Sequence, residues 1–419
     1  MTDLIAESFA LLLRWLHVIA AIAWIGESFY FVALDRGLKP PPSPEQGMVG
    51  ESWSVHGGGF YRKQKFVPAP AQLPADLLWS KWKAYTTWLS GMALFAVLYL
   101  AQPQIQLIDP AIAPMTPAQA IAAALALPVL GWIAYDLICR AFASEGDAHG
   151  ETLLALIALG VVALCAVTTQ LFAGRAAFLV TGAVLGTLMA ANVFFVIIPG
   201  QRRLVQALRT GAAIDPRDGA RGKQRSVHNT YFTLPVVFAM LATHEPAAFA
   251  HPHAWAVLAG FMAAGAGIRH FFVRWHDGGR EWWLLGVAAA LLVALLAWIA
   301  PPALASAPTT IAEPPAEAPT PSLTPTQQAA LAMPVPTTEA VLPLLALRCG
   351  GCHSATPTLI AAPPKGVAYD TAAEAEKHAA SILRQAVQLK VMPPGNMTGL
   401  TDDERAALGR WAQHVATRP

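Results

Sequence analysis

Near the end of the chain, residues 349–353 read Cys-Gly-Gly-Cys-His. Two cysteines separated by two residues, with histidine directly after the second, form the attachment signature of a c-type haem. The thiols of Cys349 and Cys352 would add to the porphyrin vinyl groups, and His353 would become one axial ligand of the iron. A structural zinc site or a disulfide is the alternative, but no second Cys/His pair at zinc spacing lies nearby. The sequence therefore predicts a covalent haem.

A ligand for the other face of the haem is expected downstream, at Met392 in the run Val-Met-Pro-Pro-Gly-Asn. A helix start follows, where Thr401 and Glu404 have the spacing of a capping box. The order of haem site, helix, Met-Pro loop and capped helix resembles a small class I cytochrome c. That resemblance makes Met392 the distal ligand, with Met397 as the alternative. His/Met ligation suits a carrier of single electrons and leaves no iron position open for a substrate.

The remainder of the chain has the composition of a membrane protein, with 55% apolar and 13% charged residues. Runs of about 20 apolar residues can cross a bilayer core of about 30 Å. The expected spans are 9–34, 83–101, 118–139, 152–173, 176–199, 229–244, 254–273 and 282–300. We therefore predict an all-α fold, a polytopic bundle of about eight spans plus the small cytochrome domain. Two further cysteines, Cys139 and Cys165, lie in apolar runs and are expected to be buried free thiols.

Basic residues in alternate loops set the expected orientation. The loops near 35–82 and 200–228 are rich in lysine and arginine, whereas the opposite set of loops offers only Arg175. This places both termini on the outer side of a bacterial inner membrane, the side on which haem c is attached. The expected domains are the membrane domain 1–300, a Pro/Ala/Thr-rich linker 301–336 and the cytochrome domain 337–419.

Ionisable and polar groups inside spans are costly to insert, so they are functional candidates. His17 lies in the first span, with Glu27 and Asp35 further along it. The remaining candidates are Ser226, His228 and Asn229 at the start of the sixth span, His244 at its end, and Arg269 and His270 in the seventh. With several histidines in so few spans, we expect at least two to bind a cofactor or a substrate. Trp24, Trp82, Trp88, Trp282 and Trp283 are interpreted as belts at the two membrane surfaces.

The loop 50–68 contains His56 followed by three glycines, which permit close approach of the backbone to a planar ligand. It is not a phosphate-binding loop, because the G-x-x-x-x-G-K-[ST] pattern is missing from the sequence. A re-entrant turn that packs under the bundle is the alternative.

Four motifs together resemble the bacterial membrane-bound urate oxidases, and the similarity extends over essentially the whole chain. They are Trp-Leu-His at 15–17 with Trp-Ile-Gly at 24–26, Val-His-Gly-Gly-Gly-Phe-Tyr at 55–61, Ser-Val-His-Asn-Thr-Tyr-Phe-Thr-Leu-Pro at 226–235, and Ile-Arg-His-Phe-Phe at 268–272. Glu27 departs from the smaller residue expected there. Members of this family join an eight-span domain to a cytochrome c. The resemblance implies oxidation of urate to 5-hydroxyisourate, with electrons leaving through the haem to a soluble cytochrome c or a terminal oxidase.

Urate is a planar, electron-rich anion, so its site needs cationic donors, flat walls and a base for water. On the expected inner side we assign this role to His228, Asn229, Arg269, His270 and His56. The expected partners are urate, the electron acceptor and the lipid bilayer, with no nucleic acid. Two alternatives stay open: a haem-linked electron-transfer protein without its own urate site, and a transporter whose cytochrome senses redox state.

Distance suggests a second cofactor. A urate site at the inner face would be separated from haem c by about 30 Å of hydrocarbon, too far for one productive electron transfer. Imidazoles on facing helices could ligate a b-type haem between them. His17 and His244 lie towards the outer side, and His228 and His270 could form a second pair. Alternatively, urate enters from the outer side and needs no relay.

Overall fold

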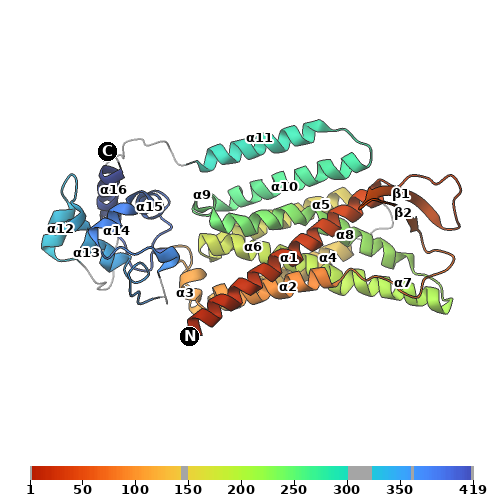
Figure 1. Cartoon of the computed structure of the whole chain (residues 1–419), viewed down its shortest axis with the longest axis horizontal. Coiled ribbons are helices and arrows are strands. Elements are labelled where there is room, and N and C mark those ends of the chain that lie inside the picture. Colours follow the sequence, from red (N-terminus) through yellow and green to blue (C-terminus); the bar gives the residue numbers. More distant parts are fainter. Residues whose placement is uncertain (1, 143–149, 301–322, 360–362, 417–419) are drawn as a thin grey trace.

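The structure is a computed structural model that describes residues 2–142, 150–300, 323–359 and 363–416. A long helical bundle carries a smaller helical unit, formed by the C-terminal residues, at one end (Figure 1). The main bundle helices are α1 (Thr2–Arg36), α2 (Trp82–Phe95), α4 (Pro117–Ala141), α5 (Gly150–Leu171), α6 (Gly174–Ala191), α7 (Ile198–Thr210), α8 (Pro216–Leu241), α10 (Ala254–His276) and α11 (Trp282–Ile299). Shorter elements are η1 (Ala96–Leu100), α3 (Pro103–Gln106), η3 (Asn192–Ile197), η4 (Ala242–His244) and α9 (Pro246–Phe249).

Six stretches among the described helices are long and apolar enough to cross a membrane. They are Ser8–Arg36, Pro117–Ala141, Gly150–Leu171, Gly174–Thr210, Ala254–His276 and Trp282–Ile299. Judged by length and apolar composition, the described helices therefore give fewer membrane spans than the eight or so predicted from the sequence. Helix α2 has only 14 residues before its winding changes at η1, and α8 begins with a strongly polar segment. Both nevertheless pack within the bundle (Figure 1), and the six long apolar helices indicate a multi-pass membrane protein.

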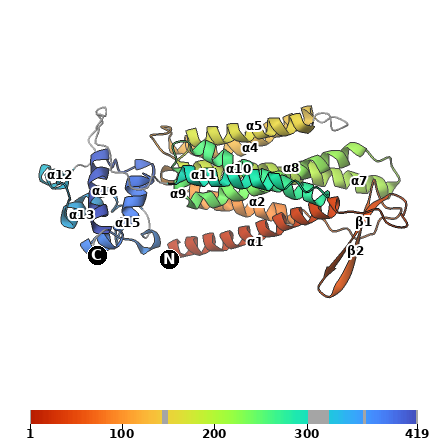
Figure 2. The ribbon, with the colours of Figure 1, turned by 90° about the horizontal axis from the view of Figure 1, so that it is seen from above.

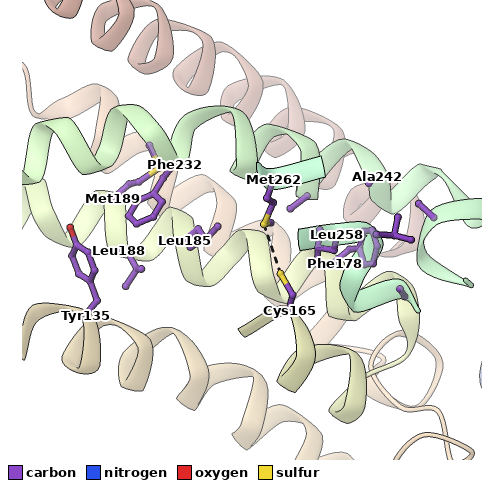
Figure 3. Packing of buried hydrophobic residues seen from close by; sticks show 14 of the residues in the cluster. Tyr135, Cys165, Phe178, Leu185, Leu188, Met189, Phe232, Ala242, Leu258 and Met262 are labelled. Atoms are coloured by element: carbon purple, nitrogen blue, oxygen red, sulfur yellow. Dashed lines mark hydrogen bonds between the residues drawn. The ribbon is translucent and has the colours of Figure 1, made fainter. Parts of the chain in front are cut away.

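The apolar core of the bundle lies where α5, α6, α8 and α10 meet (Figure 3). Phe178 and Leu185 of α6 are buried there with Leu258 and Met262 of α10. Cys165 of α5 donates its thiol to the sulfur of Met262 at 3.9 Å. Cys139 and Cys165 are both buried and free, which confirms the prediction for these two thiols.

The segment predicted as a glycine-rich loop is a β-hairpin, so the prediction of an all-α chain is wrong at this point. Strands β1 (Met48–His56) and β2 (Gly59–Phe66) are antiparallel, with His56 opposite Gly59. The turn residues Gly57 and Gly58 have φ of +57° and +80°. Positive φ at both central residues is the backbone of a two-residue hairpin turn, which glycine adopts without steric cost. The glycines therefore form a turn.

The C-terminal unit has its own core, in which Leu344, Leu345, Leu408 and Trp411 are fully buried. Its elements are α12 (Pro325–Leu331), α13 (Thr338–Arg348), η5 (Pro364–Gly366), α14 (Ala372–Lys377), α15 (Ala379–Ile382), η6 (Leu383–Gln388), η7 (Pro394–Asn396) and α16 (Asp402–Ala416). Helix α12 falls within the predicted linker, yet Leu323 and Leu331 belong to this core. The unit therefore begins earlier than residue 337. Residues 301–322 of the predicted linker lie outside the described residues.

Candidate functional site

A cavity of about 850 Å³ lies between the second half of α1 and the helices α7 and α8. This is the end of the bundle opposite the C-terminal unit (Figure 1). Its polar wall includes Ser28 of α1 and, on α8, Ser226, Asn229, Thr230 and Tyr231. The four α8 residues share one wall because they lie on neighbouring turns of the helix. The size suits a small planar molecule, since ligand cavities are commonly about 300–1,000 Å³.

Glu27 of α1 lines this cavity and is paired with Lys83 of α2. Lys83 donates to Glu27 at 2.5 Å, and the Ser80 hydroxyl donates to the same carboxylate at 2.7 Å. The unexpected acidic residue at position 27 is thus neutralised by a partner. Trp24, predicted to belong to an interfacial belt, also lines the cavity.

Arg269 is a buried cation that forms no ion pair with any residue in the described part of the chain. Its side chain comes from α10, and only 3% of the residue is exposed. The guanidinium lies 4.2 Å from the centre of the Phe29 ring, and its Nε and Nη2 have no hydrogen-bond partner among the residues that the structure describes. Val273, one helical turn further on, lines the cavity. A buried and unpaired charge is costly, so an anion bound beside it would be stabilised.

His270 reaches the cavity through one intermediate. Its Nδ1 lies 2.7 Å from the hydroxyl of Tyr231, which lines the cavity, and the two rings are stacked with centroids 6.0 Å apart. A phenol hydrogen-bonded to an imidazole can pass a proton from the cavity to the histidine. The structure thus provides a path for a proton out of the cavity.

His228 lies behind Asn229, in a buried polar network that joins α4, η3 and α8. Its Nδ1 lies 2.8 Å from the hydroxyl of Tyr135, and Asn192 donates to that hydroxyl at 3.1 Å. Asn192 also donates to Oδ1 of Asn229 at 2.8 Å. Asn192 begins the π-helical stretch η3, a type of distortion frequent at functional sites. The network holds the Asn229 amide at the cavity wall.

Arg225 and Asp136 form the charged end of the same network. Arg225 is only 3% exposed, and its Nη2 donates to Oδ1 of Asp136 at 2.7 Å. Arg140 forms an ion pair of 2.6 Å with the other oxygen of this carboxylate. Although Arg225 lies in the segment predicted as a basic loop, it is buried and paired. Its charge is therefore already compensated, unlike that of Arg269.

The remaining predicted site residues lie elsewhere. His56 is exposed beside the hairpin turn and is not among the residues that line the cavity. His17 packs against α2, where its Nδ1 lies 2.9 Å from the carbonyl oxygen of Thr87 and its ring occupies the space that a side chain at Gly91 would need. His244 lies in η4, at the opposite end of α8 from His228. His228 and His270 are each hydrogen-bonded to a tyrosine.

Asp136 and Asn192 were missed by the sequence interpretation. Each lies in a stretch predicted to span the membrane, where a carboxylate or an amide is expensive unless it has partners. A polar residue inside a predicted span was the criterion that selected His17 and Arg269, and the same criterion applies to Asp136 and Asn192. Arg225 had no comparable signal, because nothing in the sequence distinguishes it from the neighbouring exposed cations.

In the C-terminal unit, His353 of the predicted haem motif is held by a hydrogen bond and by a stacked ring. His353 follows α13, and its Nδ1 donates to the carbonyl oxygen of Val367 at 2.9 Å. Tyr369 stacks on the imidazole with ring centroids 4.9 Å apart. This hydrogen bond fixes the ring and leaves the Nε2 lone pair available for iron. Cys349 and Cys352 are free, and burial raises the pKa of the Cys349 thiol to about 12. These residues therefore fit a covalently attached haem.

The loop with the predicted distal ligand is held by Arg405 of α16. Its guanidinium donates to the carbonyl oxygens of Ala386 and Met392, the latter at 2.9 Å. Met392 and Met397 are equally exposed, at 38% each, so exposure does not decide between them. The capping box at the start of α16 is confirmed: the backbone N–H of Thr401 donates to Glu404, and that of Glu404 to the Thr401 hydroxyl, at 2.8 and 3.2 Å.

The fold and cavity define a multi-pass helical membrane protein with a polar cavity at one end of its bundle. The family model for the urate oxidase N-terminal domain matches residues 3–300. Because this match covers well over half of the chain, the chain belongs to that family. No curated protein and no solved structure matches it.

Proposed function

We propose that this protein oxidises urate to 5-hydroxyisourate and passes the electrons to a covalent haem c, and from there to a soluble cytochrome c or a terminal oxidase. The observation that carries the proposal is the buried Arg269 guanidinium of a urate oxidase family member, which lacks an ion-pair partner among the described residues and lies one helical turn from the cavity residue Val273. Urate is an anion at neutral pH. Its charge would supply the counter-ion that Arg269 lacks.

Different residues around the cavity would bind different parts of the urate anion. Arg269 would hold the negative charge, while the Asn229 amide, positioned by Asn192, would recognise the polar edge of the purine. Arg225 is not assigned a role in binding, because Asp136 already neutralises it. A hydrogen bond to a buried charge contributes about 1.5–3 kcal/mol.

The reaction releases two electrons and one proton from the urate anion as water adds to carbon 5. The chain must therefore remove electrons and accept a proton. Tyr231 and His270 are placed for the proton: Tyr231 lines the cavity, and its hydroxyl lies 2.7 Å from Nδ1 of His270. We propose that His270, acting through Tyr231, is the base that activates the water.

The electron acceptor is assigned to the C-terminal unit. Cys349 and Cys352 would hold haem c through thioethers, and His353 and Met392 would be its axial ligands. When bound, such a haem would accept and release single electrons. The proposed domain order is then a urate-oxidising membrane domain followed by a cytochrome c domain, with both termini on the outer side of a bacterial inner membrane.

The binding proposal is tested by the charge-removing variant Arg269→Gln. Urate binding to the purified protein, measured by calorimetry, should weaken roughly tenfold to a hundredfold. Arg209→Gln is the matched control, since Arg209 is exposed on α7 and donates only to the carbonyl oxygen of Ala75. Unchanged affinity in the folded Arg269→Gln protein would place the urate site elsewhere.

A further inference from the structure

One face of the β-hairpin carries three exposed apolar side chains next to the ion pair of Arg62 with Glu51. Trp53, Val55 and Phe60 share this face, because alternate residues of a strand point the same way and Val55 is opposite Phe60 in the register. They are 60%, 68% and 78% exposed. Three neighbouring large apolar side chains at this exposure need an explanation in a folded protein.

The opposite face of the hairpin is tied to α1. Lys63 donates to the Ser54 hydroxyl at 2.7 Å and lies 5.0 Å from the centre of the Tyr30 ring of α1. Lys65 forms an ion pair with Asp35, also on α1. The polar face is therefore fixed against the bundle, and the face with Phe60 is turned away from α1.

The hairpin also lies where a membrane surface is expected. It runs crosswise to the long axis of the bundle, and its tip stands out to the side near the end of α1 (Figure 2). The exposed Trp282 and Trp283 begin α11 at the same end of the bundle (Figure 1). On α1, Phe31 is 53% exposed and lies beside the hairpin residues Lys63 and Lys65. Phe31 and the two tryptophans thus expose apolar side chains at the same end of the bundle as the hairpin.

We propose that the face formed by Trp53, Val55 and Phe60 lies in the interfacial layer of the lipid bilayer and anchors the hairpin there. Aromatic and apolar side chains at the ends of membrane helices favour this layer. A second copy of the chain is a poorer occupant, because three side chains provide much less than the about 800 Å² per partner of a stable protein interface. The anchor would hold Lys65, which lines the cavity, in position. It does not depend on which molecule the cavity binds.

The test uses a fluorescent label at the tip of the hairpin. Phe60→Cys is labelled with an environment-sensitive dye in the haem-loaded, full-length protein, in which Cys139 and Cys165 are buried. Val293→Cys, from the exposed side of α11, is the lipid-facing reference, and Thr210→Cys, exposed at the end of α7, is the solvent reference. In nanodiscs with brominated lipid, the label at position 60 should be quenched to a similar extent as that at 293 and several-fold more than that at 210.

Two outcomes would overturn the proposal. Quenching at position 60 no stronger than at 210 would place the hairpin tip in water. A blue-shifted label that brominated lipid does not quench would show that a protein, such as a second copy, covers the face. Val55→Cys repeats the measurement on the same face, so the test does not depend on tolerance of the change at Phe60.

Discussion

Gly395 lies against the carbonyl oxygen of Ile108, where the C-terminal unit meets the bundle. A β-carbon at Gly395 would lie 2.8 Å from this oxygen and 3.3 Å from the Cα of Asp109. Ile108 follows α3, at the end of the bundle opposite the cavity (Figure 1). Gly395 is only three residues from Met392. The loop with the proposed iron ligand is thus also a contact with the membrane domain.

The first prediction follows from this contact. Gly395→Ala should push the two units apart, because its φ of +55° and the nearby backbone leave no room for a side chain. Reduction of the haem by urate, followed by stopped-flow absorbance, should slow at least several-fold while the haem spectrum stays unchanged. Gly366→Ala is the control, since Gly366 also has positive φ, but a β-carbon there would have no described atom within 4 Å apart from its chain neighbours. Equal rates in both variants would show that this contact is unimportant for transfer.

The second prediction concerns the haem ligands. Cys352→Ser should leave no haem attached through both thioethers, as judged by the haemochrome spectrum of the denatured protein. Met392→Ala should abolish the low-spin His/Met spectrum, whereas Met397→Ala should keep it. The reverse result for the two methionines would assign the ligand to Met397, which has the same exposure.

The third prediction tests the buried ion pair. Asp136→Asn leaves Arg225 buried without its charge partner. Breaking such a pair typically costs about 3–5 kcal/mol, so the melting temperature of the purified protein should fall by several degrees. Asp218→Asn, which breaks the more exposed pair with Arg203, should cost at most about 1 kcal/mol. Recovery of stability in Asp136→Asn with Arg225→Gln would support the ion-pair explanation, and an unaltered melting temperature in the single variant would refute it.

The fourth prediction concerns an intramembrane relay. The cavity and the C-terminal unit lie at opposite ends of the bundle (Figure 1), so we propose that a b-type haem lies between them, with His17 and His244 as candidate ligands and His228 and His270 as the alternative pair. A pyridine haemochrome measurement on the purified protein should show non-covalent haem that is lost in His17→Ala. Haem c alone, reduced by urate at a normal rate, would exclude the relay.

Residues whose role is set by local geometry could be predicted from the sequence. The spacing of Cys349, Cys352 and His353 needs no tertiary information, and neither does the capping box of Thr401 and Glu404. Long apolar runs likewise predicted most of the membrane helices. The helix α8 was predicted to begin too late, because its first turns are polar and only tertiary packing buries Arg225.

The hairpin and the cavity could be predicted only in part. Alternation from Ser52 to Val55, with glycines at 57 and 58, is the pattern of two strands and a tight turn, but the glycines were interpreted as a ligand-binding loop. The cost of polar groups inside spans drew attention to Arg269 and Asn229, and Asn229 lines the cavity. Their relation to Phe29 and Asn192 depends on how four helices pack, which no local pattern encodes.

The central proposal is tested most directly by adding urate, without oxygen, to the purified full-length protein and recording the visible spectrum. The proposal predicts that the bands of reduced haem c appear as urate is consumed, and that Arg269→Gln slows their appearance. The contradicting result would be a haem that stays oxidised with urate but is reduced by dithionite. In that case the chain would carry electrons without oxidising urate itself.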